Sequence, residues 1–131
     1  MSSDIHVPIS PGELIDKITI LEIKAARMTD TAKVANVRVE LDALQSTWQA
    51  SAHAAHDIAQ EWSELRHINE ALWDIEDKIR DKEREQQFDD EFIELARAVY
   101  VTNDQRAAVK RTINTKLGSR FVEEKSYAKY K

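Results

Sequence analysis

The chain has 131 residues, 42% of them hydrophobic and 33% charged, which is enough for one domain with a single core and excludes a multi-domain architecture. It has only two glycines and two prolines, so long stretches consist of residues that favour helices. It has no cysteine, which excludes disulfides, thiolate metal sites and cysteine nucleophiles. The net charge of −5 is uneven, because residues 105–131 carry eight lysines and arginines against two glutamates, a net +6 that leaves −11 for the first 104 residues.

Residues 1–10 are expected to form an extended arm against the bundle, because apolar and polar residues alternate from Ile5 to Ile9. A first helix is predicted near 11–28. Its start, residues 10–13 (SPGE), combines an N-cap serine, a proline at the first helical position and the glutamate of a capping box. The apolar seam of this helix consists of Leu14, Ile18, Leu21, Ala25 and Met28.

A second helix is predicted near 31–50, capped by Thr29 or Asp30 and antiparallel to the first. The apolar stripe lapses over residues 51–57 (SAHAAHD), so we expect a bend or short loop before a long third helix near 57–86. The stripe of the third helix consists of Ile58, Trp62, Leu65, Ile68, Leu72, Ile75 and Ile79.

A fourth helix is predicted near 90–117, capped by Asp89 or Asp90 and followed by Gly118 as its C′ residue, and residues 118–131 form a short tail. The residues of this helix expected to face the core are Phe92, Ile93, Ala96, Val99 and Tyr100. The sequence therefore predicts an all-α fold, a single-domain antiparallel helical bundle of about four helices with coiled-coil-like packing.

Polar residues interrupt the apolar seams of two helices. Asn103, Arg106 and Lys110 continue the stripe of the fourth helix, and a polar line flanks the stripe of the third. Because a buried cation without a partner costs several kcal/mol, these groups must meet carboxylates, a water-filled cleft or a ligand anion. We expect Lys110 to lie close to Glu76. The candidate ligand-binding residues are Glu13, Asp16, Lys17, Asn69, Trp73, Glu76, Asn103, Arg106, Lys110 and Asn114.

This polar cluster has two interpretations. It can fix the register of the helices, as interior Asn residues and ion pairs do in coiled coils. It can also be a binding site, because register needs one or two polar residues and this cluster has many more. Complete pairing of the two cations in a closed interior would favour the first interpretation, and an open pocket with unpaired donors would favour a ligand.

Three histidines could lie near one helical face. His53 and His56 have a spacing that can hold zinc or nickel, and His67 follows eleven residues later. Their neighbours are mostly alanines, however, and the first two fall in the expected bend. We predict no metal site and no cofactor.

The basic C-terminal end could bind nucleic acid, with Tyr100, Phe121, Tyr127 and Tyr130 available for stacking. The acidity of the whole chain instead favours a tail that packs on its own subunit or a sister subunit, so nucleic-acid binding is not expected. No apolar run approaches a membrane span and the first nine residues lack signal-peptide features, so we expect a cytoplasmic protein without membrane contact.

Four stretches carry a family resemblance: VPISPGELIDKITILEIK (7–24), NEALWDIEDKIRDKE (69–83), FIELARAVYVTNDQRAAVKRTIN (92–114) and LGSRFVEEKSY (117–127). Together they resemble a family of small helical proteins that is known as a domain of unknown function. The resemblance implies a helical fold and a bacterial or phage origin. It implies no activity.

Two helical enzyme families share shorter features with the chain. Glu13-x-x-Asp16 is similar to part of the acidic motif of all-α nucleotide pyrophosphohydrolases, but the later acidic residues are wrongly spaced. Residues 13–27 resemble, in their pattern of apolar and charged residues, the first helix of small helical chorismate mutases, which bind a dicarboxylate. The cations available for such an anion are Lys17, Arg27, Arg106 and Lys110.

No stretch is a specific catalytic motif, so enzymatic activity stays open. A helix of about 28 residues is roughly 42 Å long, more than a compact domain of this size spans, so apolar surface should remain uncovered at one end. We therefore predict a homodimer and a protein-binding or scaffold role. The alternative is a small helical enzyme or binding protein for an anionic metabolite.

Overall fold

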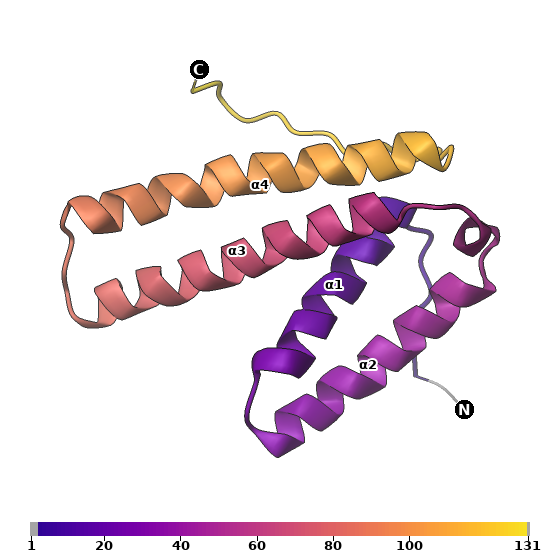
Figure 1. The fold of residues 1–131 in the computed structure, drawn as a ribbon, viewed down its shortest axis with the longest axis horizontal. Coiled ribbons are helices and arrows are strands. Elements are labelled where there is room, and N and C mark those ends of the chain that lie inside the picture. Colours follow the sequence, from indigo (N-terminus) through magenta and orange to yellow (C-terminus); the bar gives the residue numbers. More distant parts are fainter. Residues whose placement is uncertain (1–2, 131) are drawn as a thin grey trace.

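The first helix is the centre of the fold. The computed structural model describes residues 3–130, which form α1 (Pro11–Arg27), α2 (Thr31–Ala50), the 3-10 helix η1 (Ala52–Ala55), α3 (Ala59–Arg84) and α4 (Asp90–Lys116) (Figure 1). Two antiparallel hairpins, α1–α2 and α3–α4, cross at an angle, and α1 contacts each of the other α-helices. The predicted all-α bundle is confirmed, and no strand occurs among the described residues.

Side-chain caps start three of the four α-helices where the sequence predicted. The hydroxyl of Ser10 accepts a hydrogen bond from the backbone N–H of Glu13 (3.1 Å), and Asp30 and Asp89 cap α2 and α4 in the same way at 3.0 Å. At the other end of α4, Gly118 has a φ of 68°, the left-handed conformation of a C′ glycine. The predicted boundaries are therefore correct to within two residues.

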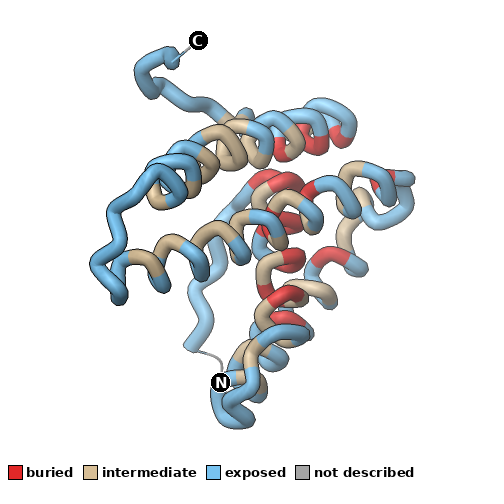
Figure 2. The backbone as a smooth tube through the Cα atoms, turned by 60° about the vertical axis from the view of Figure 1, so that its left-hand side comes forward, coloured by how far each residue is buried: buried red, intermediate tan, exposed pale blue. Residues whose placement is uncertain are grey.

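The core lies where α1 meets the start of α3 and the end of α4, with α2 closing the other side. Figure 2 shows the buried positions gathered in this half of the molecule. In the core, the rings of Trp48 and Trp62 meet edge to face with centroids 5.6 Å apart. The core residues are Leu14, Ile15, Ile18, Leu21, Leu41, Trp48, Ile58, Leu65, Ile113 and Leu117.

The loop-proximal half of the α3–α4 hairpin extends beyond this core. The last turn of α1 is marked by an ion pair between Arg27 and Asp74 of α3, and past this point α4 is the only described helix that packs on α3 (Figure 1). The prediction that Ile93, Ala96 and Tyr100 face the core is wrong. Their side chains are exposed, 53% for Ile93, because they lie at helical spacing with Asp104, on the face of α4 that is turned toward the tail.

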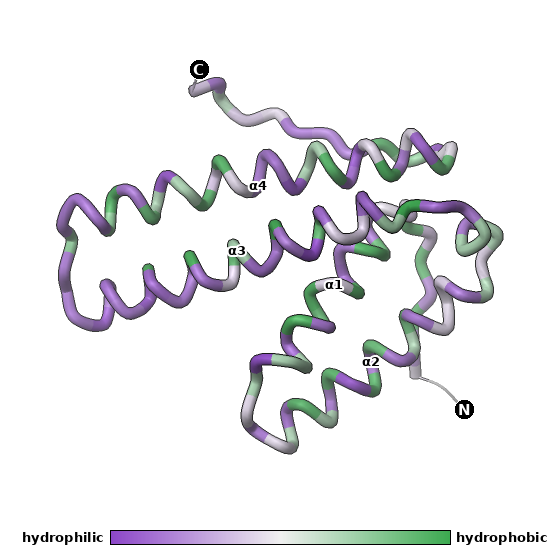
Figure 3. The backbone as a smooth tube through the Cα atoms, in the orientation of Figure 1, coloured by the Kyte–Doolittle hydropathy of each residue, from purple (hydrophilic) through white to green (hydrophobic). Residues whose placement is uncertain are grey.

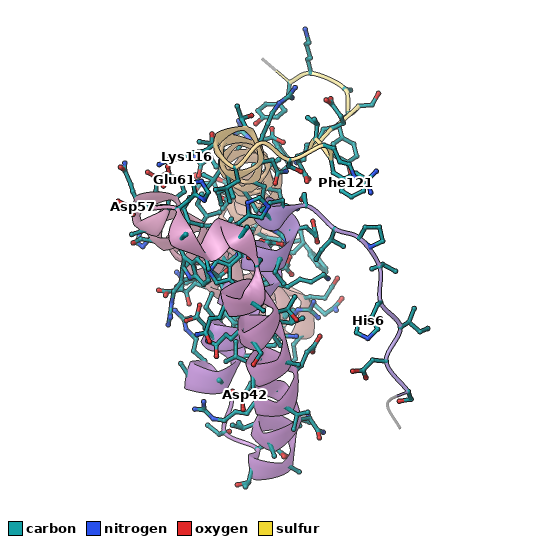
Figure 4. The ribbon with its side chains drawn as sticks, turned by 90° about the vertical axis from the view of Figure 1, so that its right-hand side faces the viewer. His6, Asp42, Asp57, Glu61, Lys116 and Phe121 are labelled. Carbon is teal, nitrogen blue, oxygen red and sulfur yellow. The ribbon has the colours of Figure 1, made fainter. Side chains whose placement is uncertain are left out.

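The arm and the tail follow different paths. Residues 3–9 are extended but stand away from the helices, with Ile5 89% exposed, so the prediction that the arm lies against the bundle is wrong (Figure 4). The tail runs back along α4, where Lys125 and Tyr130 reach Asp104 at 3.1 and 2.7 Å. Figure 3 shows that apolar and polar residues alternate along all the helices, and no helix within residues 3–130 combines the length and apolarity of a membrane span.

Candidate functional site

A buried carboxylate joins three helices. Asp16, in the second turn of α1, has a side chain that is only 1% exposed. Arg106 of α4 donates from Nε to its Oδ1 (2.9 Å) and from Nη2 to its Oδ2, a bidentate pair, and Asn69 of α3 donates to Oδ1 at 3.0 Å. Thr19, one turn along α1, accepts a second hydrogen bond from the Asn69 amide. These contacts satisfy the charge of Asp16 inside the protein.

The pairing holds Arg106 in its charged state. The hydrogen bonds that Arg106 donates to Asp16 raise the pKa of the guanidinium above its ordinary value, and this effect outweighs the opposing effect of burial. The side chain is still 29% exposed, and its remaining nitrogen, Nη1, makes only a long 3.5 Å contact with Asn103. Arg106 thus carries a compensated charge and one edge with spare donor capacity.

A second group of ions lies toward the start of α1, below the tail. The ammonium of Lys110, which is almost fully buried, lies 2.8 Å from Glu13 of α1 and 3.3 Å from Glu123 of the tail. Burial pulls the pKa of Lys110 down and is the largest single effect, but the hydrogen bond to Glu13 and the surrounding carboxylates together raise it above its ordinary value. Lys17 lies at the edge of this group, 3.9 Å from Glu13. The tail therefore supplies one wall of the Lys110 site.

The first turn of α1 rests directly on α4. The backbone N–H of Gly12 donates to Oδ1 of Asn114 at 2.8 Å. A Cβ at Gly12 would lie 2.6 Å from the carbonyl oxygen of Lys110, closer than real Cβ atoms come, so only glycine permits this approach. The buried Nδ2 of Asn114 has no hydrogen-bond partner within residues 3–130. Asn114 therefore serves first to hold α1 against α4.

An open groove of about 380 Å³ lies between α1, α3 and α4, beside the Asp16 pair. Its apolar wall includes Ile20, Ile23 and Leu72. The predicted site residues that line it are Asn69, Trp73, Glu76, Asn103 and Arg106. The structure thus divides the ten predicted residues into a groove set and the Glu13, Lys17, Lys110 and Asn114 set at the start of α1, with Asp16 buried between them.

The expected contact between Lys110 and Glu76 is wrong. Lys116 pairs with Glu61 at 2.7 Å, so in the antiparallel hairpin Lys110 lies level with the third turn of α3. Glu76 is about nine residues further along α3, a separation of roughly 14 Å. Its described ion pair is with Arg80 on its own helix, at 3.6 Å. Lys110 and Glu76 therefore lie at different heights along the α3–α4 hairpin and cannot contact each other.

Three residues of the site were not predicted from the sequence. Thr19 lies one turn from Asp16, and its spacing on α1 could have indicated it. Gly12 was interpreted only as part of a helix start, although a glycine at the second helical position is also a sign of close approach. Glu123 lies in a tail without periodic pattern, and no sequence signal places it against Lys110.

The histidines do not form a cluster. His53 lies on η1 and His56 directly follows it, with ring centroids 6.5 Å apart, and His67 lies on α3 beside a separate hollow. Among the described residues, no group of three or more His, Cys, Asp or Glu side chains could hold a metal ion.

The comparisons with known proteins agree with the resemblance seen in the sequence. No curated protein and no solved structure matches the chain. A family model described as a family of unknown function, DUF6165, matches residues 5–130, which is nearly the whole chain and includes both the groove and the Lys110 site. The chain therefore belongs to the DUF6165 family.

Proposed function

We propose that this protein is a protein-binding module that acts as a homodimer, and that its contact surface is the free end of the α3–α4 hairpin. We call residues 75–101 the hairpin tip. The observation that carries the proposal is the incomplete burial of the tip's apolar residues. Phe88, in the loop between α3 and α4, and Ile93, in the first turn of α4, are both more than half exposed. The tip residues that are only half-buried are Ile75, Ile79, Phe92, Leu95 and Val99.

Exposed apolar residues that are contiguous indicate an interaction surface, whereas scattered ones do not. The tip residues are contiguous, since the rings of Phe88 and Phe92 pack edge to face at 5.2 Å and the apolar seams of α3 and α4 meet behind them. An open apolar seam of this kind can be covered by a second copy of the same chain.

The state of the two buried cations argues against an anionic metabolite. Arg106 is neutralised by the bidentate contact with Asp16, and Lys110 lies between Glu13 and Glu123. A ligand anion would have to displace a carboxylate that is already well placed. The pairing instead supports the interpretation that these groups fix the positions of α1 and α4.

Light scattering over a concentration series tests the homodimer. We expect a dimer mass at high micromolar concentration for the native protein and a monomer mass for Ile93→Asp, because a carboxylate cannot be buried in the apolar interface. Val39→Asp is the matched control, since Val39 is also exposed but lies on α2, away from the tip. A monomer mass for the native protein at high micromolar concentration would reject the proposal.

The groove favours a second candidate function, the binding of a small ligand that is not an anion. Its volume of about 380 Å³ is within the range of ligand sites, and one face combines Trp73 and Ile23 with the spare donor edge of Arg106. Thermal-shift measurements with neutral and anionic metabolites test this candidate, since a ligand of the native state raises Tm. Loss of the shift in Trp73→Ala would place the ligand in the groove.

A further inference from the structure

We infer that the second copy docks antiparallel along α4, so that the hairpin tip of each copy lies against the C-terminal tail of the other. This inference rests on the proposed homodimer and adds its geometry. Three observations carry it: the opposite charges of the two ends of α4, the bare outer face of its first half, and the exposed apolar residues of the tail.

The two ends of the α3–α4 hairpin have opposite charge. Residues 74–97, around the loop, contain ten acidic and five basic residues, a net charge of −5. Residues 105–131, at the far end, have a net charge of +6. Because α4 has 27 residues, Asp90 and Lys116 at its two ends are roughly 40 Å apart, several Debye lengths at physiological salt. Two parallel copies would bring like charges together, whereas two antiparallel copies would bring opposite charges together at both ends.

The tail covers only the second half of α4 on its own subunit. After Gly118 it turns back along the helix, and its last described residue, Tyr130, stacks on Tyr100 with ring centroids 4.9 Å apart. The helix from Asp90 to Arg97 lies beyond the described tail, and there Ile93 faces solvent. The outer face of α4 is therefore bare at the acidic end and covered at the basic end.

The tail itself carries apolar residues that its own subunit does not bury. Val122 is 53% exposed and Tyr127 is 80% exposed, and Tyr127 lies between Lys125 and Lys129. The exposed aromatic and aliphatic residues of the tip lie among acidic ones. The two surfaces thus match in both properties, since apolar contact stabilises the interface and charge selects the antiparallel orientation.

An antiparallel arrangement about a two-fold axis satisfies both contacts at once. The midpoint of α4 is Asn103, so an axis near this residue would bring the Asp90 end of one helix to the Lys116 end of the other. The same interface then repeats on both sides of the axis, with Tyr100 close to the centre. No open end remains that could add a third copy.

Charge reversal tests the orientation. The tip variant Asp90→Lys/Glu94→Lys and the tail variant Arg120→Glu/Lys129→Glu should each weaken the dimer at least about tenfold at low salt, because like charges then meet at both ends. An equimolar mixture of the two variants should restore a dimer with close to native affinity, because opposite charges meet again. Sedimentation equilibrium of each variant and of the mixture measures these dissociation constants.

A matched control removes the effect of net charge. Glu40→Lys/Asp42→Lys changes the net charge by the same amount as the tip variant, but it lies on the exposed face of α2, far from α4 (Figure 4). This variant should dimerise like the native protein. Circular dichroism of all variants confirms that each is folded.

The outcomes separate the inference from the proposed homodimer. If the native protein dimerises and the single tip and tail variants dimerise equally well, the antiparallel orientation is wrong while the homodimer stands. If the variants dissociate but their mixture does not recover, the orientation is also wrong. If the native protein is a monomer, the proposed homodimer itself fails.

Discussion

Asp16 and Arg106 are 90 residues apart in the chain, yet two hydrogen bonds join one edge of the guanidinium to both oxygens of the carboxylate. The carboxylate is almost completely buried and has no alternative cation of comparable geometry, since Lys110 is occupied by Glu13. This pair fixes the rotation of α4 relative to α1, and it forms the floor of the groove.

Removal of the Arg106 side chain should therefore strongly destabilise the folded protein. We expect Arg106→Ala to lower the free energy of unfolding by about 3–5 kcal/mol, because it leaves the charge of Asp16 buried without a partner. Arg27→Ala is the control, since Arg27 also pairs with a carboxylate across helices but on an exposed surface, and it should cost less than about 1 kcal/mol. Urea denaturation measures both.

Combining Arg106→Leu with Asp16→Asn should recover most of the lost stability, because the double variant has no buried charge and Asn can still bond to Asn69. If instead Arg106→Ala were neutral or stabilising, the pair would not be a structural device. The groove would then become the stronger candidate for a site held at the expense of stability.

Lys110→Ala should be less damaging than Arg106→Ala. Its partners Glu13 and Glu123 are 34% and 24% exposed, so water can hydrate the carboxylates that remain. We expect a loss of about 2 kcal/mol in the free energy of unfolding. Lys110→Met with Glu13→Gln should recover part of it. Equal losses for Lys110→Ala and Arg106→Ala in urea denaturation would contradict the difference in burial.

Gly12→Ala should destabilise the protein although alanine is the better helix former. The added methyl would lie 2.6 Å from a backbone oxygen of α4, which cannot rotate away, so α1 must shift. Overpacking of this kind costs about 1–3 kcal/mol, more than the roughly 1 kcal/mol gained from helix propensity. Thermal unfolding should show a lower Tm.

Gly118→Ala is the comparison for Gly12, because nothing lies within 4 Å of its Cβ position and its cost should come only from the positive φ. This cost is expected to be about 1 kcal/mol. The NMR signals of the Asn114 side-chain amide distinguish the two variants: only Gly12→Ala should alter them, because the Oδ1 of Asn114 accepts the hydrogen bond from Gly12. An unchanged Asn114 spectrum would show that α1 accommodates the methyl without moving.

Acid should weaken the ion pair between Glu61 and Lys116, which joins the start of α3 to the end of α4. The hydrogen bond from Lys116 lowers the pKa of Glu61 below its ordinary value of 4.5, and Figure 4 shows the two side chains side by side. A carboxyl group with a lowered pKa stabilises the folded state above its unfolded pKa, and the stabilisation is lost as pH falls through the folded pKa. The loss should therefore begin near pH 4.5 and continue below it.

Glu61→Gln isolates this contribution. The native protein should be more stable than the variant at pH 7, and the difference should shrink below pH 4.5, as measured by urea denaturation at several pH values. Glu64→Gln, one turn further along α3, is the control, because Glu64 contacts only Gln60 among its described hydrogen-bond partners. A difference that does not depend on pH would contradict the assignment.

The sequence was sufficient for the helices because local signals define them. Ser10, Asp30 and Asp89 are caps that act within one turn, and the apolar periodicity of α1 identifies its buried face without knowledge of its partners. Polar interruptions on α4 also identified Arg106, which is partly buried, and Lys110, which is buried, as cations that pair with carboxylates. These properties depend on neighbours along the chain or on burial alone.

The pairing of those cations could not be predicted, because it depends on the level at which the helices cross. The spacing of Glu76 and Lys110 within their own helices contains no information about the offset between α3 and α4, which is set by the loop and by α1. The exposure of Ile93 was not predictable either, since Ile93 lies on the face of α4 that carries Asp104, and no described helix covers that face.

The contact between Gly12 and Asn114, 102 residues apart, constrains how the protein can be made. On the ribosome α1 emerges before α4, which supplies the surface against which the first turn of α1 packs. The α1–α2 and α3–α4 hairpins involve local contacts and can form during synthesis, whereas the junction between them must wait for the last turns of α4. Nascent chains should therefore keep the apolar face of α1 open until α4 has emerged, and chaperone demand should be greatest before that point.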